Sequence, residues 1–469
     1  MSKKWIPSEN NLWILTEEKP KASTIKQILG LYCRDFGSEI IIDEESLQIK
    51  PIFINGYFTF TYVVHNVLVN HIDKIYIKTV SGSSSFFDFL VFRQEDEPME
   101  GCMKNLLMAI EETKTSDDES RNTGVYQRGS KFVHIKSFAP EVKMYMLYND
   151  ELGERDGKTP SDTSVFGTSI LLTLGVEIAR KTTKGRFKPF TNLDELIRFK
   201  ASMRKAPKGN VPIEITKEGD TIYVSGLLSK PTNKGNIGHD PSIGALSLIS
   251  ACIRKLGWND KIVITKHGVS QDYANKNHTN KFWHISNALG LTLDGITINK
   301  KSDLPSQYWH YEKKSEKVAS ILLHVTAEYY GLKEVYQNHA GCERGYFKTN
   351  DSRLLALPKK NSGGENNLLL PDVILYDSKN KLILLVEGKM LTTLKAGLIE
   401  IRQYESIIRE YINKYYPDAD IECWLSIFGG NKTDVPHDEV LVYLNDDGKV
   451  YINETAPNCI KKAFDKVSK

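Results

Sequence analysis

The stretch LLLPDVILYDSKNKLILLVEGKM, residues 368–390, decides the fold prediction because it combines two apolar runs with charges at one end. The first run follows Asp372, the second ends at Glu387, and the tetrapeptide SKNK between them is typical of a turn. Residues 382–386 are apolar without alternation, which indicates a central strand covered on both faces. The stretch therefore predicts a β-hairpin whose open end brings Asp372 close to Glu387.

Two carboxylates and one ammonium are expected at that open end. Residues two apart on a strand point to the same face, so Glu387 and Lys389 share a face. Clustered carboxylates repel one another, and burial makes a compensating cation necessary. Oxygen ligands from Asp372, Glu387 and the carbonyl of Gly388 suit Mg²⁺, or alternatively Mn²⁺. Such an ion polarises a phosphoryl oxygen and activates water, which Lys389 can orient or help to deprotonate.

The motif resembles the signature of a known superfamily. Pro371-Asp372, fourteen further residues and then Glu387-Gly388-Lys389 are similar to the signature of the PD-(D/E)XK nucleases, which include most type II restriction endonucleases. The expected order of elements over about residues 311–430, namely helix, three strands, helix and strand, also resembles the core of that superfamily. The resemblance implies that Asp372 and Glu387 bind the metal ion and that Lys389 assists catalysis.

Two further site residues follow only from this resemblance. An acidic residue on the first core helix often joins such sites, and Glu316 is the preferred candidate here, with Glu328 second. Gln403-Tyr404, on a helix expected over residues 392–416, is similar to a glutamine–tyrosine element of some members. The resemblance therefore implies a supporting role for Gln403.

The carboxylate-x-lysine pattern is not specific by itself, because it also occurs at residues 17–19, 156–158 and 447–449. A second Pro-Asp pair, at residues 417–418, precedes the last of these. However, Asp447-Gly448 is typical of a hairpin turn, and Pro417-Asp418 follows a helix end instead of opening a strand. A hairpin with solvent-facing charges remains the alternative for 368–390, and the apolar run beside Glu387 argues against it.

Length and charge set the expected domain organisation. The chain has 469 residues and a net charge of only +3, so any DNA-binding surface must be local. No internal repeat is found. We expect an α/β chain, α+β overall, with a β-rich domain over 1–150, a mixed α/β DNA-recognition region over 151–310, and a nuclease domain over 311–469. The nuclease domain is expected to have a restriction-endonuclease-like core, with a mixed central β-sheet between helices.

A basic segment over residues 180–208 is the candidate DNA-binding surface. It holds ten basic residues against two acids, with Phe187 and Phe199 interleaved, and so can neutralise several phosphates. A solvated charged face is the alternative interpretation. The residues expected to contact DNA are Lys184, Arg186, Lys188, Arg198, Lys200, Arg204, Lys205 and Lys208.

The composition favours a reducing cytoplasm. Six cysteines are scattered without a C-x-x-C pair, and eleven histidines form no H-E-x-x-H motif, so we expect neither a disulfide framework nor a zinc site. The first residues lack the apolar region of a signal peptide, and no window of eighteen apolar residues occurs. A cytoplasmic location without membrane contact is therefore predicted.

These observations together predict a Mg²⁺-dependent, sequence-specific type II restriction endonuclease that hydrolyses double-stranded DNA. Because cutting both strands needs two sites, we expect a homodimer, and we expect the cognate DNA methyltransferase to be a separate protein. One alternative is another antiphage or repair nuclease of the same superfamily, acting on modified DNA or gated by a partner. A second alternative is a non-catalytic DNA-binding protein with a degenerate nuclease fold.

Overall fold

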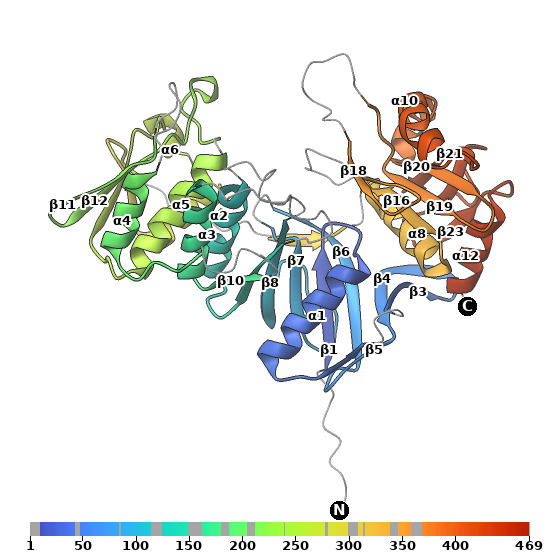
Figure 1. The fold of residues 1–469 in the computed structure, drawn as a ribbon, viewed down its shortest axis with the longest axis horizontal. Coiled ribbons are helices and arrows are strands. Elements are labelled where there is room, and N and C mark those ends of the chain that lie inside the picture. Colours follow the sequence, from blue (N-terminus) through green and yellow to red (C-terminus); the bar gives the residue numbers. More distant parts are fainter. Residues whose placement is uncertain are drawn as a thin grey trace, which may run out of the picture. The chain divides into compact units, whose positions relative to one another are not determined.

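The structure is a computed structural model of the chain, and it is a mixed α/β protein with several mixed β-sheets and interspersed helices (Figure 1). The predicted α/β class is confirmed at this level. The described residues are 10–42, 47–83, 86–113, 124–148, 162–179, 187–203, 212–238, 240–276, 280–298, 308–312, 315–337, 346–357 and 368–468. The chain forms two compact units: unit 1 comprises residues 1–81, 93–97 and 311–469, and unit 2 comprises residues 82–92 and 98–310.

The C-terminal part of unit 1 is built on a six-stranded mixed sheet in the order β16-β19-β20-β21-β22-β23. Its strands are β16 (Lys333–Gln337), β19 (Val373–Asp377), β20 (Leu382–Met390), β21 (Asp420–Phe428), β22 (Val440–Leu444) and β23 (Val450–Ile452). Strands β16, β19 and β20 are antiparallel, whereas β20, β21 and β22 are parallel. Every residue of β20 from Leu382 to Gly388 is buried, as predicted for a central strand.

Helices cover both faces of this sheet. Helix α8 (Lys317–Tyr330) packs on one face, where its Ser320 hydroxyl lies 3.1 Å from that of Ser426 on β21, and α12 (Asn458–Ser468) packs against α8. The opposite face carries α9 (Leu394–Glu400), α10 (Glu405–Ile407), a π-helical turn (Ile408–Ile412) and α11 (Asn413–Tyr415). Ile383 and Leu385 pack on that side, so alternate residues of β20 face different helices.

The two predicted hairpin turns are confirmed. In the β19–β20 hairpin the last pair is Asp377 with Leu382, so the turn is the expected SKNK, and the Asp377 carboxylate accepts hydrogen bonds from Lys379 N and Asn380 N. The β22–β23 turn contains Gly448 at a φ of 90°, and α8 ends at Gly331 at a φ of 117°. Both glycines occupy the left-handed region that disfavours other residues.

The N-terminal part of unit 1 contains a helix that the sequence interpretation missed. Helix α1 (Ala22–Phe36) lies within the first ninety residues, which were expected to be β-rich. Its buried residues Ile25, Ile28, Leu29 and Tyr32 follow the i, i+3, i+4, i+7 spacing of an amphipathic helix, so the signal was present.

Strands dominate the rest of this N-terminal part. One group, in the order β1-β6-β4-β3, consists of β1 (Asn11–Thr16), β6 (Lys74–Gly82), β4 (Tyr57–His65) and β3 (Gln48–Ile54). A short pair in this part is β2 (Ile40–Ile42) with β5 (Val67–Val69), and the C-terminal part of unit 1 has another, β17 (Tyr346–Lys348) with β18 (Leu354–Ala356).

The compact units differ from the three expected domains, although one unit boundary falls at residue 311 as expected. Residues 1–81 belong with the C-terminal part instead of forming a domain over 1–150. The physical reason is that the β3–β4 hairpin docks on the C-terminal elements. Phe58 N on β4 donates to the Gly448 carbonyl at 2.7 Å, the Phe60 and Phe428 rings meet edge to face, and β3 packs against α8 and α12.

Unit 2 contains strands in the order β10-β9-β8-β7 and a second sheet in the order β11-β12-β13-β14. The first group is β7 (Phe89–Arg93), β8 (Leu106–Thr113), β9 (Lys143–Tyr148) and β10 (Val176–Ala179). The second is β11 (Ile215–Glu218), β12 (Thr221–Ser225), β13 (Lys261–Thr265) and β14 (Leu291–Leu293). The short strand β15 (Trp309–Tyr311) follows these strands in the sequence. Strands β7 and β8 are antiparallel, and β8, β9 and β10 are parallel.

The helices of unit 2 are α2 (Gly124–Lys136), α3 (Asp162–Thr173), α4 (Leu193–Ser202), α5 (Asp240–Lys255), α6 (Gln271–Ala274) and α7 (Lys281–Leu289), with a 3₁₀ turn at Pro231–Asn233. Asn192 caps the N-terminus of α4, because its side chain accepts from Glu195 N at 2.9 Å. Helix α3 ends at Thr173, and residues 176–179 form β10.

Across the described ranges, helices that are both long and apolar enough to cross a lipid bilayer are absent.

The docking of the β3–β4 hairpin predicts that Gly448→Ala destabilises unit 1 more than its backbone strain alone accounts for. A Cβ at Gly448 would lie 2.3 Å from the Phe58 carbonyl oxygen, whereas Gly257, at a φ of 93°, has open space around that position. Both substitutions carry the left-handed penalty of about 1 kcal/mol, but only Gly448→Ala adds a clash of about 1–3 kcal/mol. Urea unfolding of both variants measures the difference, and equal losses would contradict the docking.

Candidate active site

The open end of the β19–β20 hairpin brings two carboxylates together. Val373 pairs with Val386, so Asp372, directly before β19, lies opposite Glu387. The Gly388 N–H donates to Asp372 Oδ2 at 2.9 Å, which ties the half-buried Asp372 to the neighbouring strand. The main chain of β20 therefore fixes the position of the first carboxylate relative to the second.

Glu387 is buried, with 7% of its surface exposed, and both of its oxygens are hydrogen-bonded. Lys389 Nζ lies 2.6 Å from Oε1, and the Tyr404 hydroxyl donates to Oε2 at 2.6 Å. The Glu387–Lys389 contact shows that the two side chains share a face of β20, as the alternation predicts. Burial, followed by the nearby Asp372 carboxylate, raises the pKa of Glu387 to about 7, against the opposing effects of Lys389 and Tyr404. Burial and the neighbouring carboxylate thus disfavour the charged form of Glu387, although Lys389 and Tyr404 bind it.

Lys389 is held between two carboxylates. Besides Glu387, its Nζ contacts Glu400 Oε2 on α9 at 2.9 Å. Burial alone would lower the pKa of Lys389, but the hydrogen bonds to Glu387 and Glu400 outweigh burial and raise it. The side chain therefore stays an ammonium group, which can donate hydrogen bonds and stabilise negative charge but is not a base in this state.

The first turn of α8 approaches the same site through its main chain. A Cβ on Gly388 would lie 2.1 Å from Ser320 Oγ and 3.0 Å from both Asp372 Oδ2 and the Glu316 carbonyl oxygen. Gly388 is therefore required for this close approach. The Glu316 carbonyl accepts from Ser320 Oγ at 3.3 Å, while the Glu316 side chain is exposed. Glu316 thus reaches the site with its backbone, and Glu328, about 18 Å farther along the helix axis, does not.

The glutamine–tyrosine element contributes its tyrosine. Gln403 is exposed, whereas Tyr404 is 2% exposed and bonds Glu387. The helix expected over residues 392–416 is interrupted between α9 and α10, and this break turns Tyr404 toward the sheet. Sequence reasoning missed Tyr404 and Glu400 as site residues. The apolar positions Ile401, Tyr404 and Ile407, three apart and all buried, were the available signal for Tyr404.

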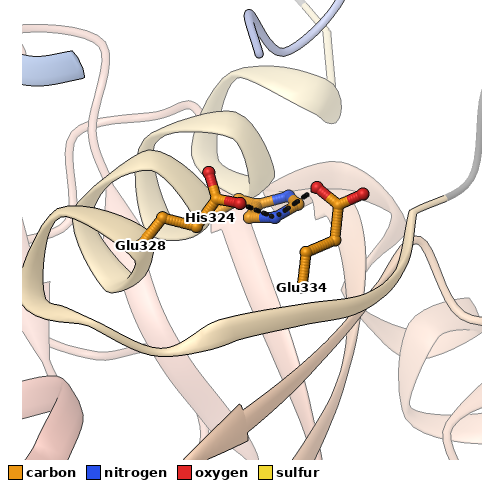
Figure 2. A group of neighbouring side chains, drawn as sticks. All are labelled: His324, Glu328 and Glu334. Atoms are coloured by element: carbon orange, nitrogen blue, oxygen red, sulfur yellow. Dashed lines mark ion pairs between the residues drawn. The ribbon is translucent and has the colours of Figure 1, made fainter. Parts of the chain in front are cut away.

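A separate group of possible metal ligands lies at the far end of α8. Figure 2 shows His324 and Glu328 on the helix and Glu334 on β16, with His324 Nε2 3.1 Å from Glu334 and 3.6 Å from Glu328. The buried ammonium of Lys19 pairs with Glu328 and lies 3.1 Å from Glu334. Burial raises the pKa of Glu334, but Lys19, followed by His324, brings it well below the ordinary value. Lys19 thus supplies the compensating charge, and the group is an ion-pair network.

The basic segment is described only in part. Lys184, Arg186, Arg204, Lys205 and Lys208 lie outside the described residues. Lys188 and Arg198 are exposed, and Lys200 on α4 lies 5.8 Å from the centre of the Phe166 ring. Phe199 stacks on Phe166 at 5.7 Å, so this aromatic residue packs α4 against α3. Lys188 and Arg198 are accordingly the described candidates for phosphate contacts.

Comparison with models of protein families, with curated proteins and with solved structures gives no match for this chain.

The Gly388 contacts predict a coupling between two substitutions. Gly388→Ala should destabilise unit 1 by about 1–3 kcal/mol, because its Cβ would overlap Ser320 Oγ. Ser320→Ala removes that oxygen, so the double variant should lose less than the sum of the single variants. A double-mutant cycle from urea unfolding measures this coupling. Additive losses of stability would show that Gly388 on β20 and Ser320 on α8 do not lie as close together as described.

The Lys19 network predicts a pH-dependent loss of stability. Lys19→Met leaves Glu328 and Glu334 partly buried without their cation, which should cost about 3 kcal/mol at pH 7. Because Lys19 lowers the pKa of both carboxyls, its contribution is fully present above their ordinary value of 4.5 and is lost as the pH falls through the lowered folded values. The loss of stability in Lys19→Met should therefore shrink between pH 7 and pH 3, which urea unfolding measures, and exposed Lys74→Met is the control. A loss that stays the same at both pH values would contradict the assignment.

Proposed function

We propose that this chain is a Mg²⁺-dependent endonuclease of the PD-(D/E)XK type that hydrolyses phosphodiester bonds of double-stranded DNA. The carrying observation is the Glu387–Lys389 pair at 2.6 Å, on one face of a central strand, with Asp372 beside it. The order of elements supports the proposal: α8 precedes the antiparallel β16-β19-β20 group, and helices lead from β20 to the parallel strand β21. This order is that of the superfamily which the motif resembles.

The residues present fit a hard divalent cation. Asp372 and Glu387 supply carboxylate oxygens, and Gly388 adds a carbonyl, so all donors are oxygen atoms. Burial, followed by the Asp372 carboxylate, raises the pKa of Glu387, and a bound cation would favour its charged form. The hydrogen bonds that these carboxylate oxygens already accept leave them able to bind a cation, because each oxygen carries two lone pairs. When bound, Mg²⁺ would polarise the phosphoryl group and acidify water.

The side chains around these donors define the rest of the mechanism. The Lys389 ammonium, fixed by Glu387 and Glu400, can orient the attacking water and stabilise charge that develops on the phosphoryl oxygens. Tyr404 holds the Glu387 carboxylate in one orientation. The water oxygen bonds to phosphorus, the bond to the 3′ oxygen breaks, and that oxygen takes a proton. The products are a 5′-phosphate and a 3′-hydroxyl.

A type II restriction enzyme is the member of this class that we favour. Unit 2 and the N-terminal part of unit 1 are far larger than a cleavage core requires, which leaves room for sequence recognition. The proposal includes action in the cytoplasm, a homodimer and a separate cognate methyltransferase. Exposed Lys188 and Arg198 would contact the DNA backbone, together with the rest of the basic segment.

The decisive experiment is digestion of unmodified phage DNA by the purified chain with Mg²⁺. Discrete bands with uniform ends are expected, and EDTA should abolish them. Asp372→Asn should lower the cleavage rate by at least about a thousandfold while DNA binding is retained, because it removes a charged ligand of the cation. Asp418→Asn is the matched control, since Asp418 also follows a proline but is 79% exposed. Unchanged cleavage by Asp372→Asn would exclude this site as the catalytic centre.

A further inference from the structure

Unit 2 contains a hairpin built like the one that carries the candidate active site. Strands β7 and β8 are antiparallel, helix α2 follows β8, and β9 then lies parallel to β8. The same order of hairpin, helical connection and parallel strand links β19, β20 and β21. In both, the second strand of the hairpin is buried between its two neighbours in the sheet.

The acidic residues occupy equivalent positions in the two hairpins. Asp88 directly precedes β7, as Asp372 precedes β19. Phe89 pairs with Ile110, so Asp88 lies opposite Glu111, just as Asp372 lies opposite Glu387. The Glu112 N–H donates to Asp88 Oδ2 at 2.7 Å, which reproduces the bond from Gly388 N to Asp372 Oδ2.

The cation partner is also present, but it comes from another element. Glu111 is 2% exposed, and Lys131 Nζ on α2 lies 2.7 Å and 2.9 Å from its two oxygens. Arg128, one turn earlier on α2, lies 3.5 Å from Glu111 Oε1. Thr113 stands two residues after Glu111, where the first hairpin has Lys389 after Glu387. The lysine has thus moved from the strand to the following helix.

The electrostatic surroundings of Glu111 also resemble those of Glu387. Burial, followed by Asp88, raises the pKa of Glu111 to about 7, although Lys131 and Arg128 oppose the rise. The same two causes act in the same order on Glu387, where the second carboxylate is Asp372. A buried glutamate beside a half-buried aspartate and close to an ammonium group therefore occurs twice among the described residues.

We propose that Asp88 and Glu111 form a second divalent-cation site in unit 2, with Lys131 as its ammonium group, and that it hydrolyses one DNA phosphodiester bond. The oxygen donors select Mg²⁺ or Mn²⁺. The reaction is the one written for the first site: water bonds to phosphorus, the 3′ oxygen leaves, and it takes a proton. The choice of DNA as substrate rests on the proposed function, whereas the cation site does not depend on it.

The test compares Asp88→Asn, Asp372→Asn and the control Glu218→Gln, which changes an exposed carboxylate of unit 2. Bound Mn²⁺ is counted on the full chain without DNA by electron paramagnetic resonance. Each of the two aspartate variants should lose about half of the bound Mn²⁺, and the control should lose none. With supercoiled plasmid and Mg²⁺, Asp88→Asn should form linear DNA at about half the wild-type rate or less, because only the first site of each chain still cuts.

A wild-type Mn²⁺ count or a wild-type rate of linear product in Asp88→Asn overturns the second site. Far-UV circular dichroism checks the fold, and the isosteric variant Glu111→Gln takes the place of Asp88→Asn if that variant does not fold. Failure of the two proposals is distinguishable. If Asp372→Asn keeps its Mn²⁺ and its cleavage rate while Asp88→Asn loses both, the first site falls and the second stands.

Discussion

The buried carboxylate of Glu387 is the constraint on which the arrangement of the candidate site depends. It stands at the end of an apolar strand whose two faces are both covered, so its charge must be met by neighbouring side chains. Lys389 and Tyr404 meet it, each at 2.6 Å. Tyr404 lies at the break between α9 and α10. The buried charge thus has one partner on its own strand and one at the interruption of the helical connection.

The hairpin was predictable because its determinants are local. Alternation of side chains placed Glu387 and Lys389 on one face, and the SKNK turn fixed the register that sets Asp372 opposite Glu387. The residues that complete the site were harder to predict. Glu400 and Tyr404 come from a helical segment whose break has no strong local signal such as proline, and the resemblance directed attention to Gln403 instead.

The contacts that could not be predicted from the sequence join segments that lie far apart along the chain. Nothing local in residues 48–65 indicates that the β3–β4 hairpin contacts the β22–β23 turn near Gly448, almost four hundred residues later. The hairpin that carries Asp88 and Glu111 was not singled out from the sequence, and the ammonium group that meets Glu111 comes from Lys131 on a helix. Local sequence motifs identify neighbouring residues on one strand, but they do not identify residues that only the tertiary fold brings together.

The division of unit 1 into separated segments has a consequence for biosynthesis. Residues 1–81 leave the ribosome long before residues 311–469, and unit 2 is made between them. The hydrogen bond from Phe58 N to the Gly448 carbonyl therefore cannot form until residue 448 has been made. Since domains generally fold as units and the N-terminal one first, unit 2 can fold during synthesis while unit 1 cannot be complete. The hairpin bearing Asp372 and Glu387 consequently gains all of its supporting contacts only after both separated segments of unit 1 have been made.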